Sequence, residues 1–442
     1  MLIYLVILII VAEFLITGSF SAPILSLMVL FICSLIFCDK DKDQKQIILY
    51  VFSLTSILAI LHYADISFNN VYTFYDEGNH YFPMVESGLK KLYLSNIFDI
   101  EDFILFKDSI GYHFYIISWG YLCNFLGEYN HLSQLMSSVF VSCIYGALFY
   151  KILKTAGFND AYKSTIVFMT FTPFILYSYV LLRDSLIALF YLLGIWVIVK
   201  QYNLLRTILL LLFFAILTAS VRFEHGIFYA VLILYSLYVK LRKRKVLFYI
   251  LVFVSVSFCL SYILDSIILA EETINDYEEY AKNTASQTGF MVRVMGLPAP
   301  FKQIFCTIIS QYFPIPGWSN FLYKDIPSFF SFIQELFVPI KVIVWGWVVF
   351  FVFVCLKTKK YGKYIRDKYG LLLLLSLMLI VAGSSEYYEE RRFMCMYPII
   401  YMAFLYAKQN IVEKHIYLMY KRNYLMIYMT LGVILTILML IK

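Results

Sequence analysis

Residues Leu205–Val221 read LRTILLLLFFAILTASV, and Arg206 is the only charged residue in this run. A helix that crosses the hydrocarbon core of a bilayer needs about 20 mostly apolar residues. The run therefore predicts a membrane-spanning helix. Twelve similar runs are found along the chain: Met1–Ser19, Ala22–Cys38, Ile47–His62, Gln134–Phe149, Ser164–Leu182, Ser185–Val199, Gly226–Val239, Val246–Leu264, Leu336–Leu356, Leu371–Ser385, Phe393–Ala407 and Tyr424–Ile441.

The composition of the whole chain fits this pattern. Of 442 residues, 62% are hydrophobic and 15% are charged, whereas a soluble domain is about half apolar and about a quarter charged. These values exclude a cytosolic enzyme, a nucleic-acid-binding protein and a disordered scaffold. We predict an all-α fold: one integral membrane domain over residues 1–442, a bundle of about 13 spans. The apolar first run, without a charged leader, is predicted to be a membrane helix rather than a cleaved signal peptide.

Loop charges predict the orientation of the bundle. The segments Lys240–Lys245, Lys357–Lys368 and Lys408–Arg422 are basic, and basic loops face the cytoplasm. Two long segments are acidic instead: 63–133 has nine acids and three bases, and 265–335 has eight acids and four bases. We expect both to be extracytoplasmic loops, the second one rich in proline.

The apolar run at residues 110–127 leaves the topology open. If it spans the membrane, the first long loop falls on the cytoplasmic side. If it lies along the interface, both long loops fall on the outer face. Its histidine and its many aromatic residues favour an interfacial helix. The count of 13 spans assumes this interpretation. Phe301–Tyr312 is a second candidate for an interfacial helix.

The first acidic loop contains the first candidate for chemistry, the sequence Tyr75–Tyr81 (YDEGNHY). Two adjacent carboxylates, Asp76 and Glu77, stand close to His80. A carboxylate in this position could accept a proton from an attacking hydroxyl. The alternative is a solvated loop with Asp and Asn in turns.

Cationic residues at the predicted outer boundary form the second set of candidates. Arginine there runs against the usual charge bias of membrane proteins, and a phosphate-bearing ligand would explain it because guanidinium binds phosphate oxygens in a bidentate manner. The alternatives are local ion pairs and, for Asp184, helix capping. The predicted ligand-binding residues are His80, Arg183, Asp184, Arg222, Glu224, Arg293, Lys302, Arg391 and Arg392.

Several signals are missing from the sequence. It has no GxxxxGK[ST] phosphate loop, no HExxH and no Cys/His set at metal-ligand spacing. We therefore predict no cofactor and no metal site, with an assisting divalent cation left open. The eight cysteines are interpreted as buried hydrophobes. His62, His113, His131 and His415 are interpreted as interfacial or structural.

The order of these features resembles the GT-C class of membrane glycosyltransferases, which use polyprenyl-linked sugars. The resemblance covers roughly Ile47–Val199: a carboxylate pair in the first outer loop, an aromatic run at 111–127, and a span ending in Pro173-x-x-x-x-Ser178 before Arg183-Asp184. It implies a GT-C-like fold in which Asp76 is the catalytic base, with Glu77 beside it.

The remaining features resemble bacterial O-antigen and capsular polysaccharide repeat-unit polymerases. They are the abundance of Tyr and Phe, the sequence Leu182–Ser185, the proline-rich second loop and Glu390-Arg391-Arg392. This resemblance implies a glycosyltransferase of the hexosyltransferase type, in the bacterial inner membrane with its active site facing the periplasm. It would polymerise polyprenyl-diphosphate-linked oligosaccharides, with a flippase and a chain-length regulator as partners.

Two other functions remain open from the sequence. A GT-C enzyme could transfer a single sugar from a polyprenyl-phosphate donor. A flippase for lipid-linked oligosaccharides is the other alternative, although the charged residues gather in loops and no duplicated halves are visible.

Overall fold

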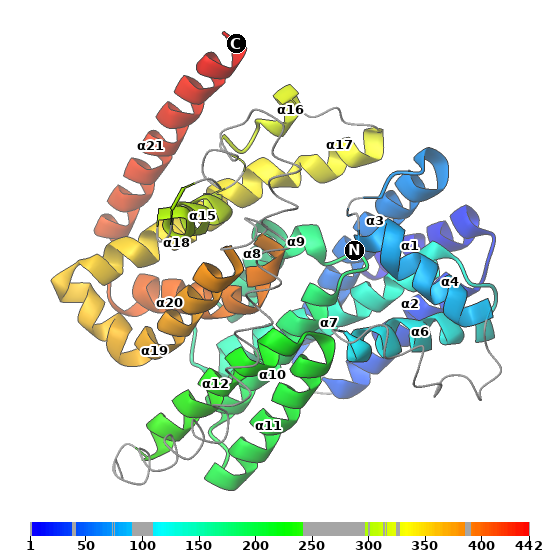
Figure 1. Ribbon diagram of the computed structural model, residues 1–442, viewed down its shortest axis with the longest axis horizontal. Coiled ribbons are helices and arrows are strands. Elements are labelled where there is room, and N and C mark those ends of the chain that lie inside the picture. Colours follow the sequence, from blue (N-terminus) through cyan, green and yellow to red (C-terminus); the bar gives the residue numbers. More distant parts are fainter. Residues whose placement is uncertain are drawn as a thin grey trace.

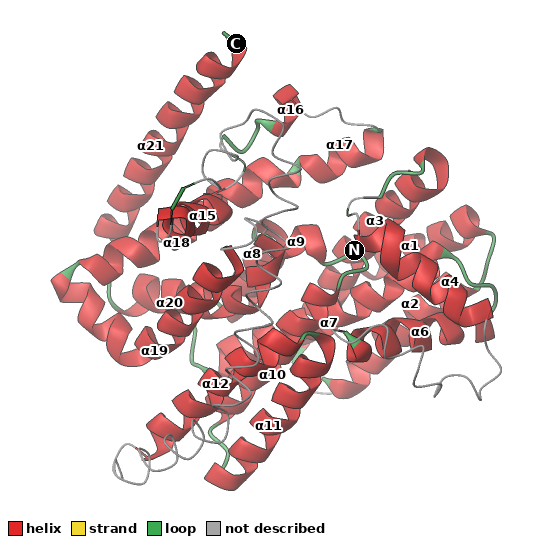
Figure 2. Ribbon diagram, in the orientation of Figure 1, coloured by secondary structure: helices red, strands yellow, loops and turns green. Residues whose placement is uncertain are grey.

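The computed structural model describes residues 2–37, 41–72, 74, 76–90, 109–241, 297–298, 301–312, 314, 316–323, 328–384 and 390–441. Within these ranges every regular element is a helix, and none is a strand (Figure 2). The all-α prediction is therefore confirmed for the described part. The candidate span Val246–Leu264, most of the second acidic loop and Arg293 lie outside it.

The N-terminal half is built around two long helices, α3 (Lys42–Asn69) and α7 (His131–Thr155), packed against α1 (Leu2–Thr17) and α2 (Ser21–Ile36) (Figure 1). Asp41, the N-cap of α3, accepts hydrogen bonds from Tyr150 at 2.7 Å and Lys154 at 2.6 Å, both near the end of α7. α3 and α7 are therefore antiparallel.

The segment between α3 and α7 contains a π-helical turn, η1 (Glu77–Tyr81), followed by α4 (Phe82–Lys90) and α6 (Ile110–Phe125). α6 lies along the first part of α7 in the opposite direction: Tyr115 donates to the Ser137 carbonyl at 2.8 Å and Trp119 donates to the Ser133 carbonyl at 3.0 Å. Because α3 and α7 are antiparallel, this segment leaves and returns at the same end of the bundle. α6 lies antiparallel to α7, and the interfacial position of 110–127 stays a prediction.

One predicted membrane span, the fifth along the chain, is wrong because it is not a continuous helix. Ser164–Leu182 is not a single helix but α8 (Ala161–Phe171), the short α9 (Phe174–Tyr177) and a non-helical segment at 178–182. Pro173 explains the break, since it has no N–H to continue the helical hydrogen bonds. The break places Arg183 at the first turn of α10 (Arg183–Lys200), which packs with α11 (Leu204–Val221), while α11 packs with α12 (Phe223–Leu241).

The C-terminal part has α15 (Phe301–Tyr312), α16 (Asn320–Tyr323), α17 (Phe329–Glu335), α18 (Phe337–Lys357), α19 (Lys359–Ser384), the 3₁₀ turn η3 (Glu390–Met396), α20 (Tyr397–Asn410) and α21 (Lys414–Leu440). α18, α19 and α20 pack together, and α21 extends away from them (Figure 1).

Two predicted loops are wrong in extent, because α19 and α21 begin inside the basic segments 357–368 and 408–422. Their lysines are compatible with helix because the long stems lie along the helix while the charges reach out.

Four described helices are long and apolar enough to cross a membrane: Lys42–Asn69, His131–Thr155, Leu204–Val221 and Ser331–Lys357. Three shorter apolar helices accompany them: Leu2–Thr17, Ser21–Ile36 and Leu232–Leu241. These helices are compatible with a membrane protein. The total of about 13 spans and the GT-C-like arrangement stay predictions.

Candidate functional site

Charged side chains gather at two opposite ends of the bundle. One end, here called the basic end, has Lys154 at the end of α7, Lys200 at the end of α10 and Lys240 at the end of α12. The other end, here called the site end, contains Asp76, Arg183 and Arg391. Helices α3 and α7 run between the two ends.

An ion pair at the site end joins distant parts of the sequence. Arg391, in η3, donates through Nη1 to Oδ2 of Asp76 at 2.9 Å. The side chains are 15% and 34% exposed, respectively. The guanidinium also lies 5.7 Å from the ring centroid of Phe74, which packs against Tyr177. Asp76 is thus a partly accessible carboxylate held beside a cation on an aromatic surface.

Tyr81 ends the π-helical turn that begins after Asp76, and its side chain is buried. Burial raises the pKa of its hydroxyl to about 12. The hydroxyl therefore stays protonated at physiological pH and can act as a neutral donor. Four charged groups influence this hydroxyl electrostatically: Arg183, Asp184, Asp76 and Arg391.

Arg183 begins α10, and its Nη1 donates to the hydroxyl of Ser109, the N-cap of α6. It also acts on His113, whose pKa is lowered to about 4 by burial first and by the Arg183 charge second. Asp184 is buried in the first turn of α10, where the helix dipole favours an acid. Arg183 and Asp184 therefore belong to the same cluster as Asp76 and Arg391.

Arg222 approaches this cluster from the junction of α11 and α12. It is the C-cap of α11, and α12 begins at the next residue. The Arg222 and Asp184 charges both act on the buried thiol of Cys395 in η3. The predicted cationic set at the site end thus includes at least three arginines from three different segments.

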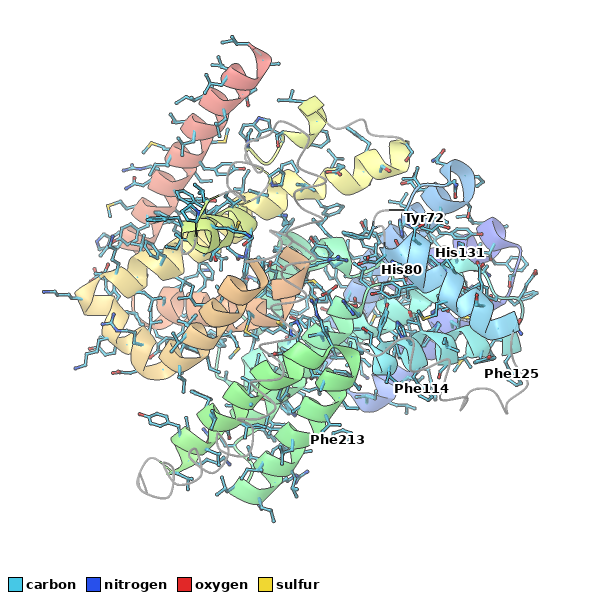
Figure 3. The ribbon with its side chains drawn as sticks, viewed as in Figure 1. Tyr72, His80, Phe114, Phe125, His131 and Phe213 are labelled. Carbon is cyan, nitrogen blue, oxygen red and sulfur yellow. The ribbon has the colours of Figure 1, made fainter. Side chains whose placement is uncertain are left out.

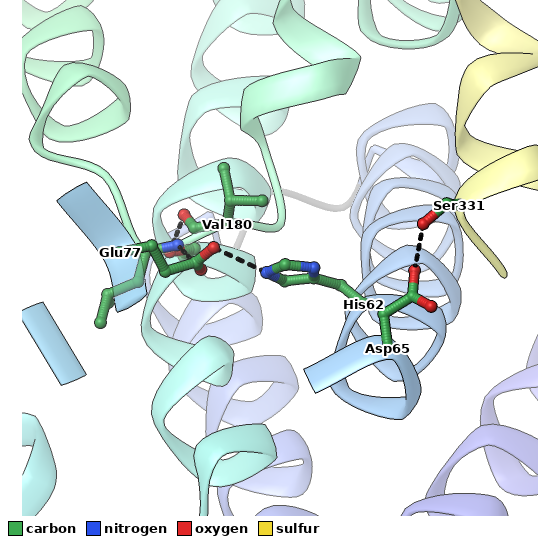
Figure 4. A network of polar contacts seen from close by, with 7 residues as sticks. His62, Asp65, Glu77, Val180 and Ser331 are labelled. Carbon is green, nitrogen blue, oxygen red and sulfur yellow. Dashed lines mark hydrogen bonds and ion pairs between the residues drawn. The ribbon is translucent and has the colours of Figure 1, made fainter. Parts of the chain in front are cut away.

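Glu77 has surroundings quite different from those of Asp76. Its side chain is fully buried, as is that of His62, whose Nε2 lies 2.7 Å from Glu77 Oε2. The backbone N–H of Leu181 donates to Glu77 Oε1 at 2.8 Å (Figure 4). Both carboxylate oxygens are therefore engaged inside the protein, which fits a holding role better than contact with a substrate.

The other predicted site residues are placed as follows. His80 is exposed, and in the view of Figure 3 it lies over the same part of the molecule as Tyr72 and His131. Lys302 is on α15, which packs against α18 and α19. Glu224 is on α12 and Arg392 is in η3, but their side chains are outside the described part.

The structural interpretation of His62 fits its buried contact with Glu77, but the sequence did not show that this contact lies at the site. Asp65 and Phe74 are not among the residues predicted from the sequence. A polar pair at the end of an apolar run, such as His62 and Asp65, was a signal that could have been used. Among the residues that the structure describes, no group of three or more His, Cys, Asp or Glu side chains could hold a metal ion.

No protein-family model, no curated protein and no solved structure matches this chain.

Proposed function

We propose that this chain is a membrane glycosyltransferase that polymerises polyprenyl-diphosphate-linked oligosaccharide repeat units at its site end. One observation carries the proposal: the partly exposed carboxylate of Asp76 is paired at 2.9 Å with Arg391, within a cluster that contains Arg183 and Asp184. The cluster lies at one end of an apolar helical bundle, so a lipid tail could stay in the bilayer while its headgroup reaches the charges.

The reaction transfers a glycan from one carrier to the nonreducing end of another. The acceptor hydroxyl oxygen bonds to the anomeric carbon of the donor, and the bond from that carbon to the diphosphate oxygen breaks. The electron pair leaves with the polyprenyl diphosphate, and the hydroxyl proton passes to Asp76. No nucleotide is consumed, because the phosphosugar bond supplies the driving force.

The charges of the cluster suit these steps. Arg183, Arg222 and Arg391 would neutralise the charge that develops on the departing diphosphate, a contribution of about 10²–10³-fold for one well-placed donor. A diphosphate competes with Asp76 for the Arg391 guanidinium. Its arrival would free the carboxylate to accept the proton, a contribution of about 10²–10⁴-fold.

The same proposal includes the location and the partners. The lysine-rich basic end would face the cytoplasm by the positive-inside rule, so the site end would face the periplasm of a bacterial inner membrane. A flippase would supply the lipid-linked repeat unit, and a chain-length regulator would limit the product.

Deleting the gene tests the function. We expect gel electrophoresis of the surface polysaccharide to show a ladder that collapses to a single repeat unit and returns with the wild-type gene. An intact ladder with altered band spacing would instead identify a transferase that adds one sugar. An unchanged ladder would contradict both enzymatic interpretations.

Substitutions in the deletion strain test the site. We expect Asp76→Ala and Arg391→Ala each to reduce the polymerisation rate at least about 100-fold, measured as ladder length at equal protein level. Lys360→Ala is the matched control, because Lys360 and Glu413 form an exposed ion pair of 3.7 Å on α19 and the N-cap of α21. A full ladder with both site variants would show that the site is assigned wrongly.

A further inference from the structure

One buried carboxylate joins the two segments that hold the charged cluster. Glu77 follows Asp76 directly, and its Oε1 accepts the N–H of Leu181, two residues before Arg183. Its Oε2 contacts His62 of α3. Glu77 thus connects the first-loop segment, the 178–182 segment and the long helix α3 (Figure 4).

The segment that Glu77 binds is fixed from its other side by α7. The Ser138 hydroxyl donates to the Val180 carbonyl at 2.7 Å, and the Ser142 hydroxyl donates to the Ser178 carbonyl at 2.7 Å. Because residues 178–182 form no regular helix, these contacts and the Glu77 contact hold the chain immediately before α10. They therefore contribute to the position of Arg183.

His62 is fixed in place by its neighbours, as the 178–182 segment is. Its ring is fully buried and lies edge-on to Tyr179 at 5.9 Å between centroids. One turn later on α3, buried Asp65 accepts a hydrogen bond from Ser331 at 2.7 Å. The end of α3 therefore gives Glu77 a rigid support rather than a flexible one.

We propose that His62 and Glu77 are a positioning pair that sets the distance between Asp76 and Arg183. The assignment rests on the proposed function, in which Asp76 takes the acceptor proton and Arg183 stabilises the leaving diphosphate. Glu77 itself touches neither substrate. A misplacement of about 1 Å between reacting groups costs about 100-fold in rate, so this pair affects turnover while leaving substrate binding largely intact.

The test compares kcat with KM for polymerisation of lipid-linked repeat units by the purified full-length protein in lipid vesicles. We expect His62→Leu to lower kcat about 10- to 100-fold with KM changed less than about threefold. His62→Gln keeps a donor for Glu77 and should recover kcat to within about fivefold of wild type. His131→Leu is the matched control: it breaks a second His–Glu pair, with Glu86 at 3.0 Å, which has no link to Leu181.

Two outcomes overturn the proposal: a kcat of His62→Leu within twofold of wild type, or a His62→Gln protein as impaired as His62→Leu. A second measurement is independent of activity. Hydrogen exchange in peptides covering 178–182 should accelerate in Glu77→Ala and His62→Leu but not in His131→Leu. If the wild-type protein makes no polymer but this exchange pattern holds, the proposed function fails while the coupling of the two segments stands. Unchanged exchange at 178–182 in both variants contradicts the pair itself.

Discussion

His113 faces the site from the first turn of α6, and its charge state is set by its surroundings. Burial and the nearby Arg183 lower its pKa to about 4, from an ordinary value of about 6.5. The unfolded chain therefore binds more protons than the folded chain between these two values. Folded-state stability from this group is fully present above about pH 6.5 and is lost as the pH falls towards 4.

Between pH 7 and pH 5, we expect protonation linked to His113 to lower the free energy of unfolding by about 1–2 kcal/mol. The unfolding temperature in detergent should therefore fall by several degrees. His113→Gln should remove this contribution, because Gln does not titrate. His131→Gln is the control, since the His131–Glu86 pair is partly exposed. The same pH dependence in wild type and His113→Gln would contradict a neutral His113.

Residue type and position in the sequence were enough to identify the acids and arginines as candidates. They could not pair Asp76 with Arg391, which lie 315 positions apart, because that contact depends on how the helices pack. The sequence also could not predict that Asp76 and Glu77 have different roles. The two carboxylates are neighbours in sequence, and only burial distinguishes them: Glu77 is fully buried, whereas Asp76 is 34% exposed.

The π-helical turn η1 depends on a glycine. A Cβ on Gly78 would lie 2.7 Å from ring atoms of Tyr72, which is too close for any real contact. π-helical turns are rare and often occur at functional sites, and this one begins directly after Asp76 and ends with Tyr81. The turn can therefore keep its geometry only if residue 78 has no side chain or the Tyr72 ring moves.

We expect Gly78→Ala to lower stability by about 1–3 kcal/mol, because it displaces Asp76 or Tyr72. If the proposed polymerase function holds, the same change should shorten the polymer. Tyr72→Ala in the same protein should restore part of the loss, a coupling that a double-mutant cycle of unfolding temperatures measures. Gly88→Ala on α4 is the control, since its Cβ would lie 3.4 Å from Ile117, an ordinary contact. Additive effects of the Gly78 and Tyr72 substitutions would show that the two residues do not clash.

The end of α3 also holds the short helix α17. Asp65 is buried and accepts hydrogen bonds from the hydroxyls of Ser328 and Ser331. We expect Asp65→Ala to accelerate amide exchange in residues 328–335 about tenfold, because both serines lose their acceptor. Asn69→Ala removes only a 3.1 Å contact to Asp65 and should change exchange less than threefold. Equal exchange in the wild-type and Asp65→Ala proteins would mean that other contacts hold α17.

Local sequence patterns predicted some elements well and others poorly. Phe301–Tyr312 was expected as a helix and forms α15 with the same bounds. Hydropathy alone missed the break at Pro173 and assigned one span to Ser164–Leu182. The density of charge predicts loops at 357–368 and 408–422, whereas most of these residues belong to helices, chiefly α19 and α21. Proline chemistry and the reach of lysine side chains explain these errors.

At the scale of the whole molecule, the directions of the helices place the lysines of the basic end and the charged cluster of the site end at opposite ends of the bundle. Asp41 joins the start of α3 to the end of α7, so the lysines near that contact and the Asp76–Arg391 pair are at opposite ends. In a membrane this separation becomes a difference between two compartments. The loops on either side of α7 can show which compartment each end of the bundle faces. Glu128 precedes that helix, Asn159 follows it, and both residues are exposed.

Labelling of Glu128→Cys and Asn159→Cys with a membrane-impermeant maleimide therefore measures the orientation of the site. We expect Glu128→Cys to react in intact spheroplasts and Asn159→Cys only after lysis, since the basic end should face the cytoplasm. The unsubstituted chain is the control for background, because the cysteines in the described residues (Cys33, Cys123, Cys143, Cys306, Cys355 and Cys395) are all buried. The reverse pattern would place Asp76 and Arg391 in the cytoplasm, where the proposed polymerisation of translocated repeat units is impossible. Labelling of both positions in spheroplasts would mean that α7 does not cross the membrane, and would contradict the bundle itself.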